Sequence, residues 1–408
     1  MAGIHNAIVI GGGIGGPVAA MALQKAGIEA TVYEAYDGTA DGVGGALSIA
    51  PNGRTALAAI DAELEAAVAA AGRPMRGMVM QSWTGKRLGE FGDLPGLPGQ
   101  LLVWRSDLYR TLYAEAVRRG VRIEHGKRLT GLTDDAAEGR VVARFADGTT
   151  AAGDVLVGAD GIRSTVRGLI DPSAPQPRYA GLLGFGARSG GEGLEDTAGK
   201  MHMVFGKRAF FGYVVAPDES GWFANLPHKT PMSAAEAKAV GAQEWLRRLA
   251  EVFAEDRTPA ARMIRHTAPE DLVITGGMED IPSVPVWHSG RVVLLGDAAH
   301  PTSPSSGQGA SLAMESGVQL ARCLRDLPVA QAFAAYEGLR RERVERIIKM
   351  AARTNSDKAA GPVARVLRDL LMPLAMRFVD PAKFTWQFDH PIDWAARVAA
   401  PEGVALPA

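Results

Sequence analysis

The sequence has almost no cysteine and no excess of charge of one sign. Cys323 is the sole cysteine among 408 residues, which excludes an internal disulfide and a cysteine-rich metal site. The 44 Lys and Arg residues balance 45 Asp and Glu residues to a net charge of −1. No field of one sign therefore attracts nucleic acid or an anionic membrane. We expect a cytoplasmic protein in which Cys323 is a small buried residue of a helix.

Long apolar runs are also missing. No stretch approaches the ~20 apolar residues that a membrane span needs, and the run from Ala7 to Ile10 stops at three glycines before an export signal is complete. The sequence shows neither a Ser/His/Asp arrangement nor metal-ligand spacing, so it predicts no metal and leaves the catalytic residues unknown. With 47% hydrophobic and 22% charged residues, we expect a globular protein of two or three domains whose partner is a small molecule.

The first motif is a glycine turn near the N-terminus. Gly11, Gly13 and Gly16 follow a β-branched run at G-x-G-x-x-G spacing and precede a helical apolar pattern. In such a turn the first glycine supplies the backbone angles, the second lets a pyrophosphate approach, and the third allows the helix to pack on the strand. A second strand ends at Glu34, where a carboxylate accepts hydrogen bonds from a ribose hydroxyl. The set predicts a dinucleotide site rather than a turn built only for packing.

Two further strands end in aspartate. Residues 154–158 form an apolar run that ends in Ala-Asp-Gly with Asp160, and residues 291–295 form another that ends in Gly-Asp with Asp297. A helix opens after the second strand, at residues 304–309. Buried strands of a parallel sheet have this composition, and an aspartate at their carboxyl ends faces the ligand crevice.

These segments, together with Arg105 in the sequence Trp-Arg-Ser-Asp-Leu, resemble the single-component FAD-dependent aromatic hydroxylases, which are para-hydroxybenzoate hydroxylase-like flavoprotein monooxygenases. The resemblance implies that the glycine turn and Glu34 hold the ADP half of FAD, and that Arg105 reaches its central part. It also implies that Asp160 lies in the motif touching FAD and a transient NAD(P)H, and that Asp297 binds the ribityl hydroxyls. The implied cofactor-binding residues are Gly11, Gly13, Ile14, Gly15, Gly16, Glu34, Ala35, Gly45, Ala46, Arg105, Leu129, Asp160, Gly296, Asp297, Pro304, Gly307, Gln308, Gly309 and Ala310.

The segment from Gly44 to Ser48 and the general layout resemble most the tetracycline-inactivating branch and its antibiotic-tailoring relatives. Many members of the family carry an arginine shortly before this glycine pair. This sequence has Asp41, Gly42 and Val43 at that place instead of the arginine. The difference from the family pattern bears on how NAD(P)H reaches and reduces the flavin.

The expected fold class is α/β, with a Rossmann-like FAD-binding domain, an inserted substrate domain made of a mostly antiparallel β-sheet, and C-terminal helices. Alternating apolar runs separated by turns predict the antiparallel sheet. We assign residues 1–72, 101–177 and 286–325 to the FAD-binding domain, 73–100 and 178–285 to the substrate domain, and 326–408 to a C-terminal helical segment.

Apolar side chains of the inserted sheet are candidates for the substrate pocket, although half of such a stripe normally packs against helices. These candidates are Met203, Phe210, Phe211, Tyr213 and Phe223, with Asn225 as a polar selector. His300 either packs beside the crevice or takes part in catalysis, and we favour packing. Arg163 and Arg167 stand at a helix start, oppose its dipole and therefore need a partner such as a phosphate or a carboxylate.

The C-terminal part of the sequence contains a charged helical pattern and an amphipathic one. Mixed charges around Arg340 and Arg343 predict a solvated helix face. Residues 361–379 are amphipathic and interrupted by Pro373, which favours docking across the domains or a dimer contact over a membrane role, so the protein is expected to be a monomer or a homodimer.

The single glycine turn leaves one full dinucleotide domain, so FAD would occupy it while NADPH or NADH visits briefly. The resemblance then implies an FAD-dependent monooxygenase that uses NAD(P)H and O2 to hydroxylate an aromatic or polycyclic substrate, of a secondary-metabolite or antibiotic-like kind, through a flavin hydroperoxide. Backbone N–H groups at the helix opening from Gly307 to Ala310 would stabilise an anionic reduced flavin. A flavin oxidase or dehydrogenase, or a non-catalytic flavin-binding protein, is the alternative.

Overall fold

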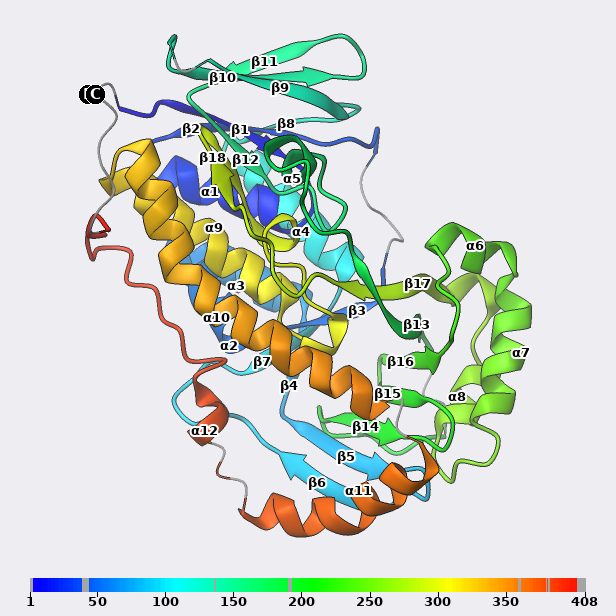
Figure 1. The fold of residues 1–408 in the computed structure, drawn as a ribbon. Coiled ribbons are helices and arrows are strands. Elements are labelled where there is room, and N and C mark those ends of the chain that lie inside the picture. Colours follow the sequence, from blue (N-terminus) through cyan, green and yellow to red (C-terminus); the bar gives the residue numbers. More distant parts are fainter. Residues whose placement is uncertain are drawn as a thin grey trace.

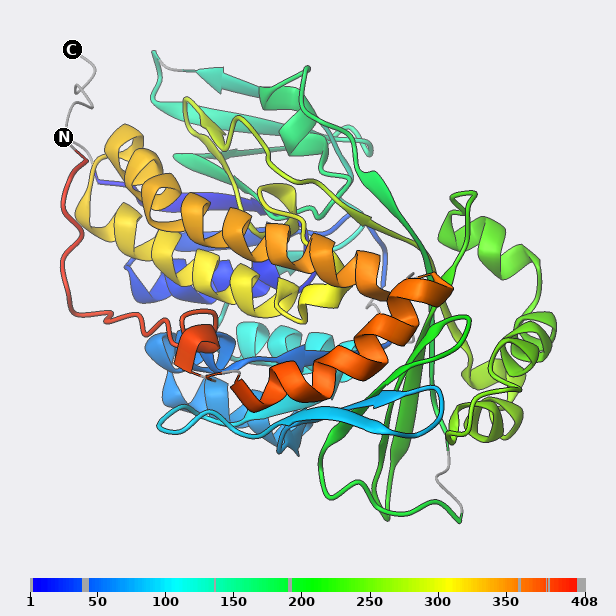
Figure 2. The same ribbon diagram turned by 60° about the horizontal axis from the view of Figure 1, so that its bottom comes forward.

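A computed structural model describes residues 3–38, 44–135, 137–189, 193–358, 361–378, 380 and 382–401 (Figure 1). Asp41, Gly42 and Val43, where the sequence departs from the family pattern, lie outside the described residues. The described residues form two sheet-based bodies with a layer of sheet and helices between them, as the second view also shows (Figure 2).

A six-stranded sheet forms the centre of the first body. Its order is β18-β19-β12-β1-β2-β8, and every neighbouring pair is parallel except β18 with β19. The strands are β1 (Asn6–Ile10), β2 (Glu29–Tyr33), β8 (Arg122–Glu124), β12 (Val155–Gly158), β18 (His288–Ser289) and β19 (Val292–Leu294). Strands β1, β12 and β19 are buried along nearly their whole length, as expected for parallel strands covered on both faces.

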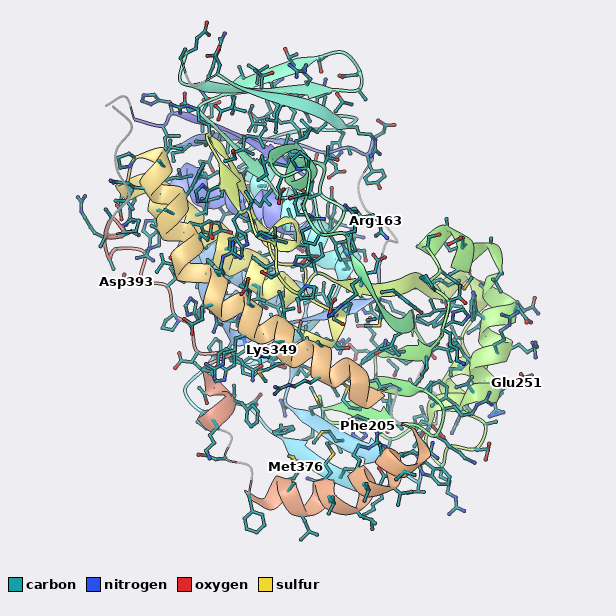
Figure 3. The ribbon with its side chains drawn as sticks, viewed as in Figure 1. Arg163, Phe205, Glu251, Lys349, Met376 and Asp393 are labelled. Carbon is teal, nitrogen blue, oxygen red and sulfur yellow. The ribbon has the colours of Figure 1, made fainter. Side chains whose placement is uncertain are left out.

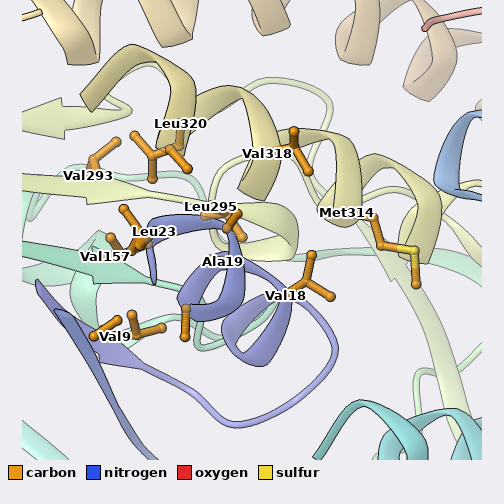
Figure 4. Packing of buried hydrophobic residues seen from close by; sticks show 14 of the residues in the cluster. Val9, Val18, Ala19, Leu23, Val157, Val293, Leu295, Met314, Val318 and Leu320 are labelled. Atoms are coloured by element: carbon orange, nitrogen blue, oxygen red, sulfur yellow. The ribbon is translucent and has the colours of Figure 1, made fainter. Parts of the chain in front are cut away.

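Helices cover one face of this sheet and a small antiparallel sheet covers the other (Figure 1). The helices are α1 (Gly15–Lys25), α9 (Gly309–Asp326) and α10 (Val329–Lys358); the small sheet consists of β9 (Leu129–Asp135), β10 (Arg140–Phe145) and β11 (Thr150–Gly153), with α5 (Thr165–Ile170) beside it. Small residues let α1 and α9 approach closely, because a Cβ on Gly317 would lie 3.2 Å from the Cα of Ala19. Figure 4 shows the apolar side chains that fill this contact.

The second body is a seven-stranded sheet of order β17-β13-β16-β15-β14-β5-β6, antiparallel except for the pair β14 and β5. Its strands are β5 (Met78–Ser82), β6 (Arg87–Phe91), β13 (Arg178–Arg188), β14 (Met201–Phe205), β15 (Phe210–Val215), β16 (Ser220–Pro227) and β17 (Val273–Asp280). One face is covered by α6 (Ala234–Ala239), α7 (Ala242–Val252) and α8 (Ala260–Arg265). The fold class predicted from the sequence is thus confirmed.

A third layer connects the two bodies. It contains the sheet β3-β7-β4 and the helices α2, α3 and α4. Their bounds are β3 (Ala46–Ile49), β4 (Arg73–Met75), β7 (Gln100–Trp104), α2 (Pro51–Ile60), α3 (Ala62–Ala71) and α4 (Arg105–Arg118). Two separate chain segments, one with β5 and β6 and one with β13 to β17, build the seven-stranded sheet. The domain ranges given above stay a prediction.

The C-terminal part begins with the 30-residue helix α10 and continues through α11 (Pro362–Ala375), η4 (Met376–Phe378) and α12 (Ala382–Thr385). The segment after α12 runs back along α9 and α10 without regular structure (Figure 1). Arg325 holds it through the carbonyl of Ala396, and the Asp326 carboxylate accepts from Val398 N at 2.8 Å. In the described part of the chain, no helix has the length and apolar character needed to cross a membrane.

Candidate active site

The glycine turn has the backbone geometry that its sequence predicts. Gly11 has φ +105°, and a Cβ there would lie 2.5 Å from the carbonyl oxygen of Ala159. A Cβ on Gly16 would meet the carbonyl oxygen of Gly11 at 1.9 Å, so the first turn of α1 and the end of β1 can pack only with glycine. A Cβ on Gly13 would meet nothing within 4 Å. The turn therefore leaves open space in front of its middle glycine.

Unpaired backbone donors lie beside that space. Ile14 is the N-cap of α1 and makes no side-chain cap hydrogen bond, so the first N–H groups of this 11-residue helix are available to an anion. Gly15 packs within 3.0 Å of Leu295 and 3.6 Å of Ala313, measured from its ideal Cβ. The start of α1 therefore lies next to the end of β19 and the start of α9. The glycine turn and the segment that contains Asp297 are thus neighbours in the fold.

Glu34 closes the same edge of the sheet. Its carboxylate accepts hydrogen bonds from the backbone N–H groups of Gly12 at 2.6 Å and Tyr36 at 3.0 Å. These bonds fix the Glu34 side chain beside the glycine turn, just after the end of β2. Ala35 is the next residue of the loop. Leu129 begins β9 and is buried opposite Phe145 in the apolar core.

Asp160, at the carboxyl end of β12, is held by its own loop. Its carboxylate accepts from Ser164 Oγ at 2.5 Å and from Val166 N at 3.1 Å, and burial raises the pKa of Asp160. Arg163 forms the expected carboxylate pair, with Glu279 at 2.9 Å. Arg167 is buried and donates to the carbonyl oxygens of Ala298 and Ile162, so a phosphate is not needed to explain it.

Asp297 lies just after the carboxyl end of β19, where it follows Gly296 with φ +60°. Its residue surface is partly accessible, but its carboxylate lies among protein atoms. Burial raises the pKa of Asp297 to about 6, and the positive charge of Arg105 opposes this shift. Arg105 is exposed at the start of α4, its N–H donates to Gly45 O at 3.1 Å, and its side chain packs on Gly44. The charge of Arg105 therefore acts on Asp297, so these two candidate cofactor residues lie near each other.

The loop before α9 comes next along the chain. Pro304 begins the short helix η3 (Pro304–Ser306), and Gly307 follows with φ +62°. Ser48 Oγ donates to Gly307 O at 2.9 Å, which fixes the loop beside Ala46 and the rest of β3. Gln308 is the N-cap residue of α9, and its side chain accepts no hydrogen bond from the first turn of the helix. The N–H groups at the start of α9, at Gly309 and Ala310, are therefore not capped by Gln308.

Behind this loop lies a buried hydrogen-bonded ring that the sequence did not predict. Asn52 Nδ2 donates to Gln308 Oε1 at 3.1 Å and to Glu315 Oε1 at 2.5 Å. Arg343 donates to Glu315 at 2.8 Å and to the carbonyl oxygen of Gln387 at 2.8 Å. Gln308 Nε2 also donates to that carbonyl oxygen, at 3.3 Å, and so closes the ring.

A second guanidinium completes the network. Arg340 is fully buried and ion-paired with Glu315. Burial favours the neutral carboxyl, but Arg340 and Arg343 outweigh it and bring the pKa of Glu315 to about 2. One carboxylate thus faces two guanidinium groups behind the start of α9. The prediction of a solvated face is wrong for Arg340, because α10 packs on α9 along this side.

His300 is a packing residue, as favoured above. It is buried, its Nε2 lies 2.8 Å from Ser316 Oγ, and its ring contacts Trp287. Burial lowers the pKa of His300 to about 3, so the imidazole is neutral. Cys323 is buried in α9, which confirms the expectation from composition. No three His, Cys, Asp or Glu side chains gather into a metal site in the described ranges.

The face of the seven-stranded sheet opposite α7 and α8 lies toward the start of α4. Trp104, the residue before Arg105, lies 3.1 Å from the ideal Cβ position of Gly221 on that face. Strand register places four of the predicted pocket residues on the same face: Met203, Phe210, Phe223 and Asn225.

Phe211 and Tyr213 point the other way. Phe211 is fully buried and contacts Phe253 edge-to-face at 5.2 Å, and Tyr213 belongs to the same sheet–helix core. The prediction that these two residues line the pocket is corrected, because successive residues of a strand alternate between faces.

Comparison with known proteins identifies the class of this site. A family model described as an FAD binding domain matches residues 5–351. The chain belongs to this family. Its curated relatives include the FAD-dependent urate hydroxylase of Klebsiella pneumoniae, 33% identical over 87% of this chain and 91% of that protein. They also include the 3-amino-4-hydroxybenzoate 2-monooxygenase PtmB3 of Streptomyces platensis, 32% identical over 92% of this chain and 94% of that protein.

Solved structures agree with this assignment to the FAD-dependent aromatic hydroxylases. Klebsiella pneumoniae HpxO complexed with FAD and uric acid superposes with a TM-score of 0.80, at 27% identity over 93% of this chain and 94% of that one. The tetracycline destructase Tet(51) has a TM-score of 0.65 at 18% identity, covering 93% of this chain and 99% of that one, and shares the fold. The hydroxylase is therefore an oxidoreductase, an FAD-dependent monooxygenase.

The residues of this hydroxylase fit the cofactor of its family. Open space in front of Gly13, free N–H groups at the start of α1 and a fixed carboxylate at Glu34 suit a pyrophosphate and a ribose. Asp297 and the loop before α9 follow β19 at the same carboxyl edge of the sheet. The sequence motifs located these groups, whereas the ring behind the loop depends on contacts across more than 250 residues.

Proposed function

We propose that this hydroxylase uses NAD(P)H and O2 to hydroxylate an aromatic or polycyclic substrate. The observation that supports this best is that the end of the central sheet and one face of the seven-stranded sheet meet at Trp104 and Arg105; the proposal includes a crevice between these two walls. One wall carries Asp297, Arg105 and the amide-rich start of α9, and the other is the face of the sheet with Met203 and Phe223. The first suits a cofactor and the second suits an apolar ring.

In this proposal the glycine turn and Glu34 hold the ADP half of FAD, Asp297 accepts hydrogen bonds from the ribityl hydroxyls, and Arg105 binds the central part. Gly307 and the start of α9 border the flavin ring. When bound, FAD supplies the electrons and activates O2 for transfer of one oxygen atom.

The chain itself contributes electrostatics and exclusion of water. The positive end of the α9 dipole lies at Gly309, and the network behind it holds two guanidinium groups against the single carboxylate of Glu315. Both features stabilise negative charge at the mouth of α9 without an ionisable side chain in contact with it. The apolar face with Phe210 and Phe223 keeps water from the reacting groups.

The substrate class follows from the second wall. The four predicted pocket residues on this wall are apolar or aromatic apart from Asn225, which pairs in register with Phe210. This composition suits a flat aromatic substrate oriented by a hydroxyl or carbonyl group. The relatives named for urate and for 3-amino-4-hydroxybenzoate act on compounds of this general kind.

Stopped-flow spectroscopy of the FAD-loaded protein tests the proposal. NADPH or NADH should bleach the flavin faster in the presence of a suitable phenolic or polycyclic compound, and the product should be 16 mass units heavier. Substrate oxidation with release of H2O2 and no gain in mass would identify an oxidase instead. Purified protein that retains no flavin after incubation with FAD would contradict the proposal altogether.

A further inference from the structure

Helix α11 turns its apolar side away from the protein. Its inner side contacts β6, and its outer side lies on the surface (Figures 1 and 2). Six side chains of α11 and one of η4 form this outer surface, which we term the α11 face. They are between 51% and 85% exposed: Val363, Val366, Leu367, Leu370, Leu371 and Leu374, with Phe378 of η4. Amphipathic helices of globular proteins normally bury such a stripe.

Specific contacts fix this orientation. On the inner side, Arg365 donates to the carbonyl oxygen of Lys207, and the Arg368 guanidinium lies 4.3 Å from the ring centre of Phe205. Lys86 Nζ donates to the carbonyl oxygen of Asp369 at 3.1 Å. Met376 packs beside Gly89 of β6, and Figure 3 shows it near Phe205 at this end of the molecule. The arginines of α11 are therefore directed inward.

The size of the α11 face points to a protein partner. Seven apolar side chains, each more than half exposed, lie together in the α11 face rather than singly. Contiguous exposed apolar patches mark interaction sites, and interfaces between copies of one chain are more apolar than the rest of the surface. We propose that the α11 face is the interface between two copies of this chain.

The spacing of its residues suits pairing with itself. Val363, Leu367, Leu370 and Leu374 follow one another at intervals of four, three and four, the pattern of a helix–helix seam. Two copies of α11 related by a two-fold axis pack antiparallel, with Leu367 and Leu370 next to the axis and Val363 opposite Leu374 of the partner subunit. No charged residue interrupts the α11 face in the described residues.

A lipid surface suits the α11 face less well. Helices that lie on membranes combine an apolar face with Lys and Arg residues that reach lipid headgroups. Arg365 and Arg368 are instead engaged with Lys207 O, Asp369 and Phe205. The proposal concerns assembly and stands whether or not the proposed reaction is correct.

Sedimentation velocity of the FAD-loaded protein at 1 to 50 µM tests the interface. The unchanged protein should sediment as a dimer, and the double variant Leu367→Glu/Leu370→Glu as a monomer with unchanged flavin content. Leu339→Glu is the matched control, because Leu339 is an exposed leucine of α10 outside the α11 face. A wild-type protein that stays monomeric at 50 µM would overturn the proposal.

Crosslinking supplies a second readout that does not depend on the folding of a charged variant. Cys323 is buried, so Leu370→Cys adds a single reactive thiol. A short bismaleimide should join two Leu370→Cys chains and should leave Val117→Cys, on the exposed side of α4, uncoupled. A monomeric protein that co-sediments with phosphatidylglycerol vesicles through the α11 face would assign it to membranes and overturn the dimer.

Discussion

Asn52 links the loop before α9, through Gln308, to the buried carboxylate of Glu315. Both hydrogens of its Nδ2 are used, one toward Gln308 Oε1 at 3.1 Å and one toward Glu315 Oε1 at 2.5 Å. Asn52 is fully buried in α2, so no water replaces either bond. The position of the Gln308 loop is therefore coupled to a charged network in the protein core.

Replacing Asn52 should loosen this loop. Asn52→Leu leaves Gln308 Oε1 without this donor and removes one donor from Glu315, which keeps Arg340 and Arg343. A buried unpaired acceptor costs roughly 1–3 kcal/mol. We expect a lower free energy of unfolding and faster FAD release, measured by urea denaturation and by flavin fluorescence. Thr55→Val is the control, because Thr55 bonds only the Asn52 carbonyl oxygen on the same helix. Equal FAD release by Asn52→Leu and wild type would contradict the coupling.

Glu315 should give the protein a distinctive acid response. Its folded pKa of about 2 lies below the ordinary 4.5, so its stabilisation is present above pH 4.5 and is lost as the pH falls toward 2. Glu315→Gln leaves the buried charges of Arg340 and Arg343 without a carboxylate partner and should cost about 3–5 kcal/mol at pH 7. Its unfolding free energy should then fall less steeply between pH 5 and pH 2 than that of wild type. Glu251→Gln, on the exposed side of α7, should retain the wild-type slope.

Replacing Asp297 should affect the stability of the apoprotein and its affinity for FAD in different ways. Its folded pKa of about 6 is raised, so the apoprotein gains stability as the pH falls from 6 toward the ordinary value of 3.8. Asp297→Asn should abolish this gain while weakening FAD binding by at least about tenfold, since hydrogen bonds to a charged acceptor contribute roughly 1.5–3 kcal/mol. Titration by flavin fluorescence and thermal unfolding of the apoprotein measure the two effects. Asp93→Asn, in an exposed loop, should change neither.

Gly13 tests the phosphate site by the addition of one methyl group. A Cβ there meets no protein atom within 4 Å, so Gly13→Ala should fold as well as wild type. The methyl group would occupy space that we assign to the pyrophosphate, and FAD affinity should fall more than tenfold in an equilibrium titration. Gly168→Ala also adds a methyl group in open space and should bind FAD normally. Unchanged affinity in Gly13→Ala would move the cofactor away from the turn.

The two faces of β15 and its neighbours should respond differently to truncation. Phe211→Ala removes a fully buried ring from the sheet–helix core and should cost about 3–5 kcal/mol of unfolding free energy. Met203→Ala, on the crevice side, should cost less than half of that and should change the ratio of product formed to NAD(P)H consumed. Chemical denaturation measures the two unfolding free energies, and product analysis measures the ratio of product to NAD(P)H. A large stability loss with unchanged coupling in Met203→Ala would place Met203 in the core.

The parts of the candidate site that local backbone rules govern were predictable. Gly11, Glu34 and Asp297 lie at strand ends, where the glycine turn or the end of the strand places them whatever the distant contacts are. The fold class followed from the same local patterns.

Other features depend on which face a side chain takes in the assembled fold. Phe210 and Phe211 are neighbours of equal hydrophobicity, and only the position of α7 and α8 decides which one packs in the core. Arg340 carries a charge that normally signals solvent, yet Glu315 from another helix pairs with it in the interior. The helical period of α11 was likewise visible, whereas its reversed orientation depends on contacts such as that of Arg368 with Phe205.

The closed ring behind the loop also sets an order of events during synthesis. Its last acceptor, the carbonyl oxygen of Gln387, lies 79 residues after Gln308 along the chain. A nascent polypeptide that carries the whole glycine turn and all six strands of the central sheet still lacks this acceptor while its later residues remain in the ribosome. We expect stable cofactor loading to wait until that segment has emerged and folded back, so truncation before residue 387 should yield a colourless protein.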